Sequence, residues 1–284
     1  MKRTVPSVRP WAAVWGSPIA HSLSPTLHTT AYAALGLEWE YRAHEVTVAT
    51  LATEFASVDE GVRGLSLTMP LKESVLEVVA AHETVVDVLG VANTVVFGAE
   101  GPFLTNTDPL GVEGALKDAD VDVETAWIVG AGATARSVGY ALAARGVRDI
   151  VLVVRDLSRA SATADVLRRL GGNVTVVHHE NLAEMPSPGL VVNTLPGGAE
   201  FPFAPSTSLL RSSALFDVAY HPWPSAAASL WQAEGAPVIS GLPMLVHQAL
   251  HQIRWFVQGD GSEPLPSESA VLDSMMRSVG LSAS

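Results

Sequence analysis

The sequence predicts an α/β fold, with a first domain built on a mostly parallel sheet and a second, doubly wound domain of the Rossmann type. Two observations lead to this class. Short apolar runs alternate with helical patterns along most of the chain, which is typical of parallel sheets. The apolar run 126–129 leads into the glycine-rich turn Gly130-Ala-Gly132 and then into an alanine-rich helical segment that ends at residue 144. The length of 284 residues accommodates two ordinary domains.

The first part of the chain alternates regularly. Strands are expected at residues 12–15, 39–46, 62–68 and 91–96, and helices at 26–35, 51–58 and 72–81. Gly36 is a normal stop for the first helix, and Pro70 suits the first turn of the third because its missing N–H costs nothing there. A polar segment, 103–108, follows a Gly-Pro turn, and a helix begins near Gly111, so we place the first domain boundary at residue 108.

The second part repeats the alternation with more strands. We expect strands at residues 126–129, 149–154, 174–177, 190–195, 215–219 and 237–240, and further helices at 158–170, 244–257 and 270–279. The helix 244–257 has an apolar stripe at helical spacing. An open doubly wound sheet of this kind holds its ligand at the carboxyl ends of the strands.

The glycine-rich turn has the strand–turn–helix context that a dinucleotide-binding site needs. Gly130 permits a tight turn, Gly132 lets the backbone approach a pyrophosphate, and the small Ala135 lets the helix pack on the strand. The helix begins with Ala133 and Thr134. Its N-terminal end offers free N–H groups and the positive end of the helix dipole to phosphates. We therefore predict a dinucleotide site here; a purely structural turn is the alternative.

Composition excludes several functions. The net charge of −12 argues against nucleic acid and anionic membranes as partners, because both carry negative charge. The chain has no cysteine, which excludes disulfides, thiolate metal sites and a cysteine nucleophile and is compatible with a reducing cytoplasm. No apolar run reaches membrane-spanning length. We expect a cytoplasmic protein whose partner is a small molecule.

Two histidine pairs raise the question of a metal. His247 and His251 have the i, i+4 spacing of a metal-binding pair, but no acidic third ligand accompanies them. His178 and His179 are adjacent along a strand and are expected to face opposite sides. We therefore expect no metal site.

Five polar motifs accompany the glycine-rich turn. They are Gly16-Ser-Pro-Ile-Ala-His-Ser22-Leu-Ser24-Pro25, Ser66-Leu-Thr68-Met-Pro70-Leu-Lys72, Asn93-Thr94, Asn106-Thr107-Asp108 and Gly241-Leu-Pro-Met-Leu-Val-His-Gln248-Ala. With these motifs in this order, the chain resembles the shikimate dehydrogenase family over nearly its whole length. The resemblance implies a two-domain enzyme in which residues 1–108 and 244–284 form the substrate domain and residues 109–243 form the cofactor domain.

The resemblance also implies a reaction, the reversible reduction of 3-dehydroshikimate to shikimate by hydride from a nicotinamide cofactor. Hydride addition to the ketone leaves an alkoxide that must be protonated, so a positioned acid is required. Lys72 matches the catalytic lysine of the family, and Asp108 matches its partner aspartate. Without the motifs, the same residues would be a surface lysine and a helix-capping aspartate.

The substrate of the family is a carboxylate with several hydroxyls. Ser22 and Ser24 carry over as donors to the carboxylate, and two serines two apart in an extended segment point the same way. The partners of the ring hydroxyls carry over as Thr68, Asn93, Asp108 and Gln248, and Tyr220 matches a family tyrosine near substrate and nicotinamide. For the hydroxyl residues, the alternative role is turn or cap formation.

Two departures from the family pattern bear on specificity. Ser66 stands where the family usually has asparagine, so a substrate contact is lost or mediated by water. The usual Asn-Arg-Thr after the second strand is replaced by Val154-Arg155-Asp156. Arg155, with Arg159 as support, can pair with a 2′-phosphate, whereas Asp156 would repel one.

We therefore expect NADP as the cofactor, with NAD as the alternative, and the resemblance adds Gly241 to the cofactor-binding residues. Two other functions remain open. One is an NAD-dependent quinate or aminoshikimate dehydrogenase. The other is a catalytically silent sensor, against which the retention of both Lys72 and Asp108 argues. The expected assembly is a monomer or a homodimer.

Overall fold

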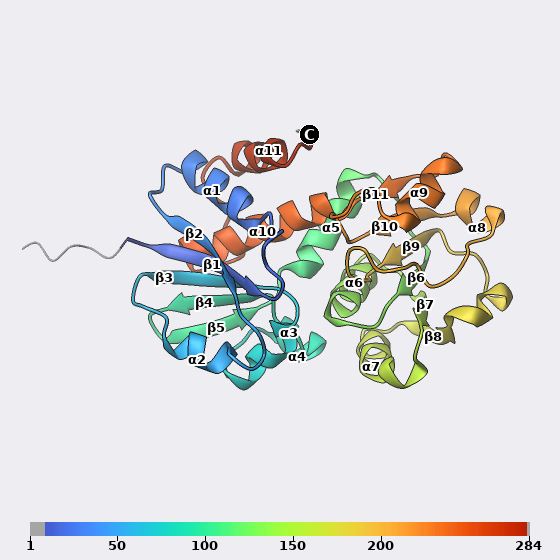
Figure 1. Ribbon diagram of the computed structural model, residues 1–284, viewed down its shortest axis with the longest axis horizontal. Coiled ribbons are helices and arrows are strands. Elements are labelled where there is room, and N and C mark those ends of the chain that lie inside the picture. Colours follow the sequence, from blue (N-terminus) through green and yellow to red (C-terminus); the bar gives the residue numbers. More distant parts are fainter. Residues whose placement is uncertain (1–8, 283–284) are drawn as a thin grey trace, which may run out of the picture. The chain divides into compact units, whose positions relative to one another are not determined.

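The computed structural model describes residues 9–282 (Figure 1). The chain forms two compact units: residues up to Thr107 join with those from Ala249 onward, and Asp108–Gln248 form the other. We expected the second boundary at residue 243, but it falls inside helix α10 (Gly241–Gln258). The reason is close packing in the second unit. A Cβ added at Gly111 of helix α5 (Asp108–Asp118) would lie 2.6 Å from the carbonyl oxygen of Met244, so the start of α10 packs on α5.

The sheet of the first unit is mixed. Its strands are β1 (Trp11–Gly16), β2 (Glu40–Glu45), β3 (Val62–Leu67), β4 (Thr94–Gly98) and β5 (Gly101–Thr105), in the spatial order β2-β1-β3-β4-β5. β1 is parallel to β2 and β3, whereas β4 is antiparallel to both β3 and β5. The predicted α/β class is confirmed. The antiparallel half, which the sequence did not indicate, arises because the chain reverses between β4 and β5 through the turn at residues 99–100.

Short helices cover this sheet. They are α1 (Ser24–Ala34), α2 (Leu51–Ala56), α3 (Leu71–Ser74), the 3₁₀ turn η1 (Val75–Glu77) and α4 (Thr84–Leu89), together with the second part of α10, and α11 (Glu268–Ser278) packs against α1. On one face, Leu51, Leu71 and Val86 pack with the side chains of β1. On the other, Phe256 of α10 packs so closely on β3 that a Cβ at Gly64 would overlap its ring. The helix expected at 72–81 breaks into α3 and η1, a segment rich in β-branched valines.

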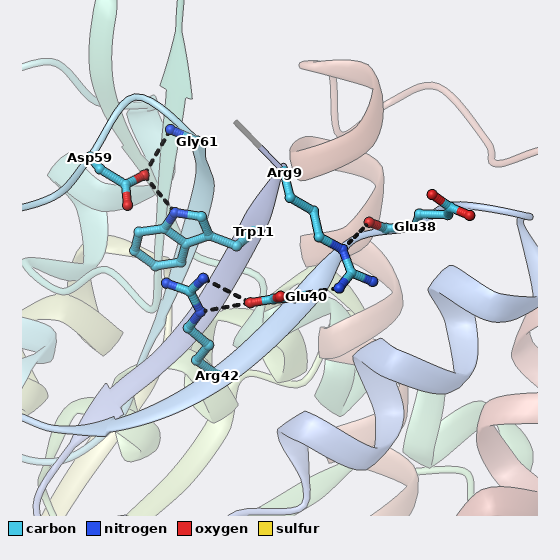
Figure 2. A network of polar contacts seen from close by, with 7 residues as sticks. All are labelled: Arg9, Trp11, Glu38, Glu40, Arg42, Asp59 and Gly61. Carbon is cyan, nitrogen blue, oxygen red and sulfur yellow. Dashed lines mark hydrogen bonds and ion pairs between the residues drawn. The ribbon is translucent and has the colours of Figure 1, made fainter. Parts of the chain in front are cut away.

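A polar network joins the N-terminal ends of β1 and β2 to the segment before β3 (Figure 2). Asp59 accepts hydrogen bonds from Trp11 Nε1 at 2.7 Å and from the Gly61 amide at 2.8 Å. Arg42 lies over the Trp11 ring at 4.6 Å and donates to the carboxylate of Glu40. These contacts hold three segments together at the end of the sheet opposite to the carboxyl ends of β1 and β3.

The second unit is a six-stranded parallel sheet. Its strands are β6 (Thr125–Val129), β7 (Asp149–Val154), β8 (Asn173–His178), β9 (Leu190–Asn193), β10 (Ala214–Asp217) and β11 (Val238–Ile239). Their spatial order is β11-β10-β9-β6-β7-β8, and every pairing is parallel. This is the doubly wound order, in which the strand sequence reverses between β6 and β9. The Rossmann-type prediction is confirmed.

Alternate side chains of β6 enter the two apolar layers of this unit. Ile128 joins a core with α5, α6 (Ala133–Ala144) and α7 (Ser161–Arg169), whereas Trp127 joins a core with α8 (Thr207–Ser212) and α9 (Ala226–Ala233). Helices α8 and α9 and the 3₁₀ turn η3 (His179–Glu184) were not expected from the sequence. The helix expected at 158–170 is divided into the 3₁₀ turn η2 (Leu157–Arg159) and α7. Among the described residues, no helix is both long and apolar enough to span a membrane.

Candidate active site

Four polar segments of the first unit meet at one edge of its sheet: those that follow β1, β3 and β5, and the one that precedes β4. β1, β3 and β5 end at this edge, and β4 begins there because it runs the opposite way. Backbone hydrogen bonds tie the segments together: the Thr68 amide donates to the Trp15 carbonyl at 2.9 Å, and the Ala92 amide donates to the Lys72 carbonyl at 2.8 Å. The residues expected to bind substrate in this unit, Ser22, Ser24, Thr68 and Asn93, therefore lie on neighbouring segments.

Gly16, at the end of β1, makes this edge compact. A Cβ at Gly16 would lie 2.3 Å from the Thr68 methyl carbon and 2.8 Å from the Met69 carbonyl oxygen. The Ser17 amide donates to that same carbonyl at 2.9 Å. A side chain at Gly16 would therefore separate the loop that contains the serines from the loop that contains Thr68.

The two serines are close, but for a different reason from the one expected. The segment is not extended, because Leu23 is already in the helical region and Ser24 is the first residue of α1. The Ser24 amide donates to Ser22 Oγ at 3.3 Å, so Ser22 also takes the turn-forming role that was its alternative. Ser24 is buried and Ser22 is half-buried.

The predicted catalytic residues belong to different units. Lys72 is half-buried in α3, which Pro70 precedes in the cap position. Asp108 is buried and is the first residue of both α5 and the second unit. Tyr220 and Gln248 also belong to the second unit.

The amide of Asn93 is held in one orientation. Its Oδ1 accepts hydrogen bonds from Thr94 Oγ1 at 2.7 Å and from the Thr107 amide at 2.8 Å, and its Nδ2 donates to Thr107 Oγ1 at 3.0 Å. All three residues are almost fully buried. Thr94 and Thr107 are part of the quoted motifs, but the sequence did not indicate that they orient Asn93.

The glycine-rich turn lies at the reversal point of the second sheet. Gly130 follows β6 with a φ of +108°, and a Cβ there would lie 2.5 Å from Thr194 Oγ1, which donates to the Val129 carbonyl. Gly132 is the N-cap of α6, at φ −90°, and no described atom beyond its chain neighbours lies within 4 Å of a Cβ built there. The protein itself thus requires a glycine at 130 and leaves open space at 132.

The first turn of α6 matches an anion site. Ala133 and Thr134 are partly exposed, and the N-cap Gly132 has no side chain that could cap this turn. Ala135 is fully buried in the core with Ile128, so it lets the helix pack on the strand as expected. These features fit a phosphate group bound by backbone N–H groups.

The Asp156 side chain, in the segment after β7, is oriented by Ser158. Its carboxylate accepts hydrogen bonds from the Ser158 amide at 2.9 Å and from Ser158 Oγ at 2.6 Å, which lower its pKa and cap the 3₁₀ turn η2. Arg155 precedes this turn and Arg159 is its last residue, and both are exposed. The Arg155 carbonyl lies 3.0 Å from His178 Nε2, which ties the position to β8.

Glycine at position 241 is explained by packing. A Cβ there would lie 2.0 Å from the Val218 carbonyl oxygen, so α10 can begin beside the end of β10 only with glycine. Gln248 is buried and donates to the Leu245 carbonyl at 3.0 Å. Tyr220 is partly exposed in the segment after β10. That segment is anchored by buried Asp217, which accepts from Asn193 Nδ2 at 3.1 Å and which no sequence motif indicated.

The histidines are arranged differently from the expectation in one respect. The rings of His178 and His179 lie 4.5 Å apart instead of on opposite sides, because β8 ends at His178 and His179 begins η3. His247 Nε2 lies 2.7 Å from a carboxylate oxygen of Asp118. Among residues 9–282, no group of three or more histidine, aspartate or glutamate side chains is placed to hold a metal.

Comparison with known proteins gives consistent relatives. Residues 14–95 match the shikimate dehydrogenase substrate binding domain. The chain is 34% identical over 263 residues to the shikimate dehydrogenase (NADP(+)) of Methanosarcina barkeri, covering 88% of this chain and 92% of that protein.

Solved structures agree. The shikimate 5-dehydrogenase of Thermus thermophilus in complex with NADP(H) and shikimate matches with a TM-score of 0.79 and 30% identity, covering 95% of this chain and 99% of that one. The quinate dehydrogenase of Corynebacterium glutamicum in complex with NAD matches with a TM-score of 0.78 and 26% identity, covering 95% and 99%.

Proposed function

Because the chain belongs to the shikimate dehydrogenase family, we propose that it catalyses the reversible NADP-dependent reduction of 3-dehydroshikimate to shikimate, a step of chorismate and aromatic amino acid biosynthesis. The observation that carries this proposal is that the loop with Ser22 and Ser24, the Thr68–Lys72 segment and Asn93 meet at one edge of the first sheet. The same chain has a glycine-rich turn, typical of dinucleotide sites, where the strand order of the second sheet reverses between β6 and β9.

A bound reduced nicotinamide would supply hydride to the ketone carbon, and the protein would have to supply the proton. We assign this proton to Lys72, with Asp108 as its partner carboxylate in the family motif. A positioned acid contributes roughly 10²–10⁴-fold to such a rate. The buried amide of Asn93 and the hydroxyls of Ser22, Ser24 and Thr68 supply neutral donors and acceptors. Such groups suit a hydroxylated carboxylate better than an apolar ligand. Gln248 and Tyr220 complete the proposed substrate set.

NADP is the proposed cofactor. Arg155 is exposed after β7, where the adenosine ribose binds in this fold, and a guanidinium can hold a 2′-phosphate through two hydrogen bonds. Asp156 is engaged by Ser158, so it caps η2 while its charge still lowers the affinity for a phosphate. Arg155→Ala should abolish the preference for NADP over NAD, and Asp156→Thr should strengthen it. The test is the ratio of kcat/KM for NADP to kcat/KM for NAD. A wild-type ratio below one that Arg155→Ala leaves unchanged would overturn this assignment.

An NAD-dependent quinate dehydrogenase is the second candidate. Two observations favour it: an acidic residue follows Arg155, and the quinate dehydrogenase of Corynebacterium glutamicum is similar over nearly the whole chain. The two candidates differ in substrate. Quinate carries an additional hydroxyl on the carbon that bears the carboxylate, so the site around Ser22 and Ser24 would have to admit it.

The direct test is oxidation of shikimate by purified protein, followed by NADPH absorbance. We expect turnover in the wild type and a loss of at least about a hundredfold in kcat for Lys72→Ala. Absence of turnover with shikimate, with turnover of quinate and NAD, would replace the proposal by the second candidate. Binding of shikimate without any turnover would favour a sensor.

We further propose that the enzyme acts in the cytoplasm as a monomer or a homodimer. Its proposed substrate and cofactor are small metabolites, and a chain without cysteine needs no oxidising compartment to fold. Light scattering coupled to size-exclusion chromatography distinguishes the two assemblies, since the chain mass is 29.8 kDa.

A further inference from the structure

A continuous series of hydrogen bonds runs through the first unit, from β2 to the start of β4, and all of them except the first, which is part-buried, are buried. Tyr41 donates from its hydroxyl to Ser66 Oγ at 2.7 Å, and Ser66 donates to Gln252 Oε1 at 2.6 Å. The Nε2 of Gln252 donates to the Asn93 carbonyl at 3.1 Å and to Thr94 Oγ1 at 3.0 Å. The series thus joins α10 to the strands β3 and β4.

The last hydrogen bonds of the series reach Asn93, which is proposed to bind the substrate. Thr94 Oγ1, which accepts from Gln252, donates in turn to Asn93 Oδ1 at 2.7 Å. Gln252 therefore contacts Asn93 twice, once directly at its backbone carbonyl and once through Thr94. Because the Thr94 hydroxyl has a single hydrogen, accepting from Gln252 leaves that hydrogen to the Asn93 amide oxygen.

We propose that Gln252 is a positioning residue that fixes the Asn93 amide for recognition of a substrate hydroxyl, with Ser66 and Tyr41 holding Gln252 in place. This inference rests on the proposed function, because it assigns Asn93 to substrate. It also gives Ser66 a purpose that the sequence did not indicate: instead of facing substrate in place of a longer amide, its hydroxyl links Tyr41 to Gln252.

Burial makes the orientation strict. Gln252 is 1% exposed and Ser66 is 4% exposed, so an unmatched donor or acceptor there has no access to water. The amide of Gln252 uses its oxygen for Ser66 and its nitrogen for Asn93 and Thr94, and a flipped amide would face two acceptors with an oxygen. The series therefore has one favourable arrangement.

His28, which interacts with the Gln252 amide, and Tyr41, the first residue of the series, are both neutral near pH 7. His28 stacks on Tyr41 at 3.9 Å, and burial lowers the pKa of His28 to about 3, against the smaller opposing effect of the neighbouring Gln252 amide. Burial raises the pKa of Tyr41, against the smaller effect of its hydrogen bonds with Ser66 and Ser24. The wild-type series therefore contains no group that titrates near neutral pH.

The test compares three variants of the full-length enzyme. Gln252→Leu keeps the approximate volume and removes all three hydrogen bonds. Gln252→Glu keeps the acceptor for Ser66 but replaces the amide donor by a carboxyl. Gln258→Leu is the matched control, since Gln258 is exposed on the same helix and bonds only to the Glu263 carbonyl among the described contacts. KM for shikimate, KM for NADP, kcat and the melting temperature are measured for each.

We expect Gln252→Leu to raise KM for shikimate by about tenfold or more, as for a lost buried hydrogen bond. KM for NADP should stay unchanged, and Gln258→Leu should match the wild type. In Gln252→Glu, burial raises the pKa of the new carboxyl, and its ionised form faces the Asn93 carbonyl. KM for shikimate of this variant should therefore rise as pH increases from about 5 to 8, relative to the wild type.

Other outcomes overturn the inference. A lower melting temperature with unchanged KM for shikimate in Gln252→Leu would show a purely structural role. If Gln252→Leu does not fold, a KM profile for Gln252→Glu that parallels the wild type across pH would likewise show that Gln252 does not position Asn93. A wild-type enzyme that does not turn over shikimate defeats the proposed function instead, so the two failures are distinguishable.

Discussion

Gly130 and Gly132 are separated by one residue, yet we expect their replacement by alanine to have different consequences. Gly132→Ala should leave stability nearly unchanged and weaken NADP binding. The backbone at Gly132 has an unstrained φ of −90°, and a Cβ there meets no described atom within 4 Å. If glycine is needed at this position, the need comes from a ligand rather than from the protein.

The magnitudes follow from the geometry. For Gly132→Ala, the reduced entropy of the unfolded chain stabilises by about 0.4–1 kcal/mol, and the poorer N-cap offsets this by a similar amount. Gly130→Ala instead places a side chain at φ +108° and 2.5 Å from Thr194 Oγ1, which bonds to the Val129 carbonyl. Strain and the displaced hydrogen bond together should cost about 2–4 kcal/mol.

Urea unfolding without cofactor measures the free energy of unfolding of each variant, and fluorescence titration with NADPH measures its affinity for the cofactor. We expect Gly132→Ala to unfold within about 1 kcal/mol of the wild type and to bind NADPH at least about tenfold more weakly, because its methyl group displaces the pyrophosphate from the α6 N-terminus. Wild-type affinity in Gly132→Ala would refute the pyrophosphate assignment. A loss of stability equal to that of Gly130→Ala would refute the packing argument.

Three further predictions test other parts of the molecule. Lys72→Ala should lower kcat by about 10²–10⁴-fold while shikimate still binds by calorimetry; a near-normal kcat would exclude Lys72 as the acid. The double variant Ser22→Ala with Ser24→Ala should raise KM for shikimate more than it lowers kcat, and the reverse pattern would contradict carboxylate binding. Hydrogen bonds from Trp11 and Gly61 lower the pKa of Asp59, so its stabilising contribution is complete above about pH 4 and is lost as pH falls through the lowered folded-state pKa. The melting temperatures of the wild type and Asp59→Asn should therefore converge below about pH 4. A difference in melting temperature that stays the same between pH 7 and pH 3 would show that the negative charge of Asp59 does not stabilise the fold.

Local patterns in the sequence were sufficient for much of the fold. The apolar run before Gly130 and the helix after it are β6 and α6, and the six strands expected in the second half are all present in one parallel sheet. These signals succeed because strand, turn and helix each depend on neighbouring residues. The mixed pairing of the first sheet was not accessible, since a strand's apolar pattern does not state the direction of its partner.

The candidate site shows the same limit. The motifs identified Asn93 and Ser66 as positions of interest, but not the contact between Ser66 and Gln252, which are 186 residues apart. The extended geometry expected for the serine loop was wrong because Ser24 already belongs to α1. Asp156 had no predictable direction until the bonds from Ser158 were known. Contacts of this kind depend on tertiary packing, and a pattern of residue types does not specify them.

The proposed activity is tested most directly by steady-state kinetics with four pairs of substrates: shikimate or quinate, each with NADP or NAD. We predict the highest kcat/KM for shikimate with NADP, and loss of the cofactor preference in Arg155→Ala. A higher kcat/KM for quinate with NAD, unchanged by Arg155→Ala, would contradict the proposed activity.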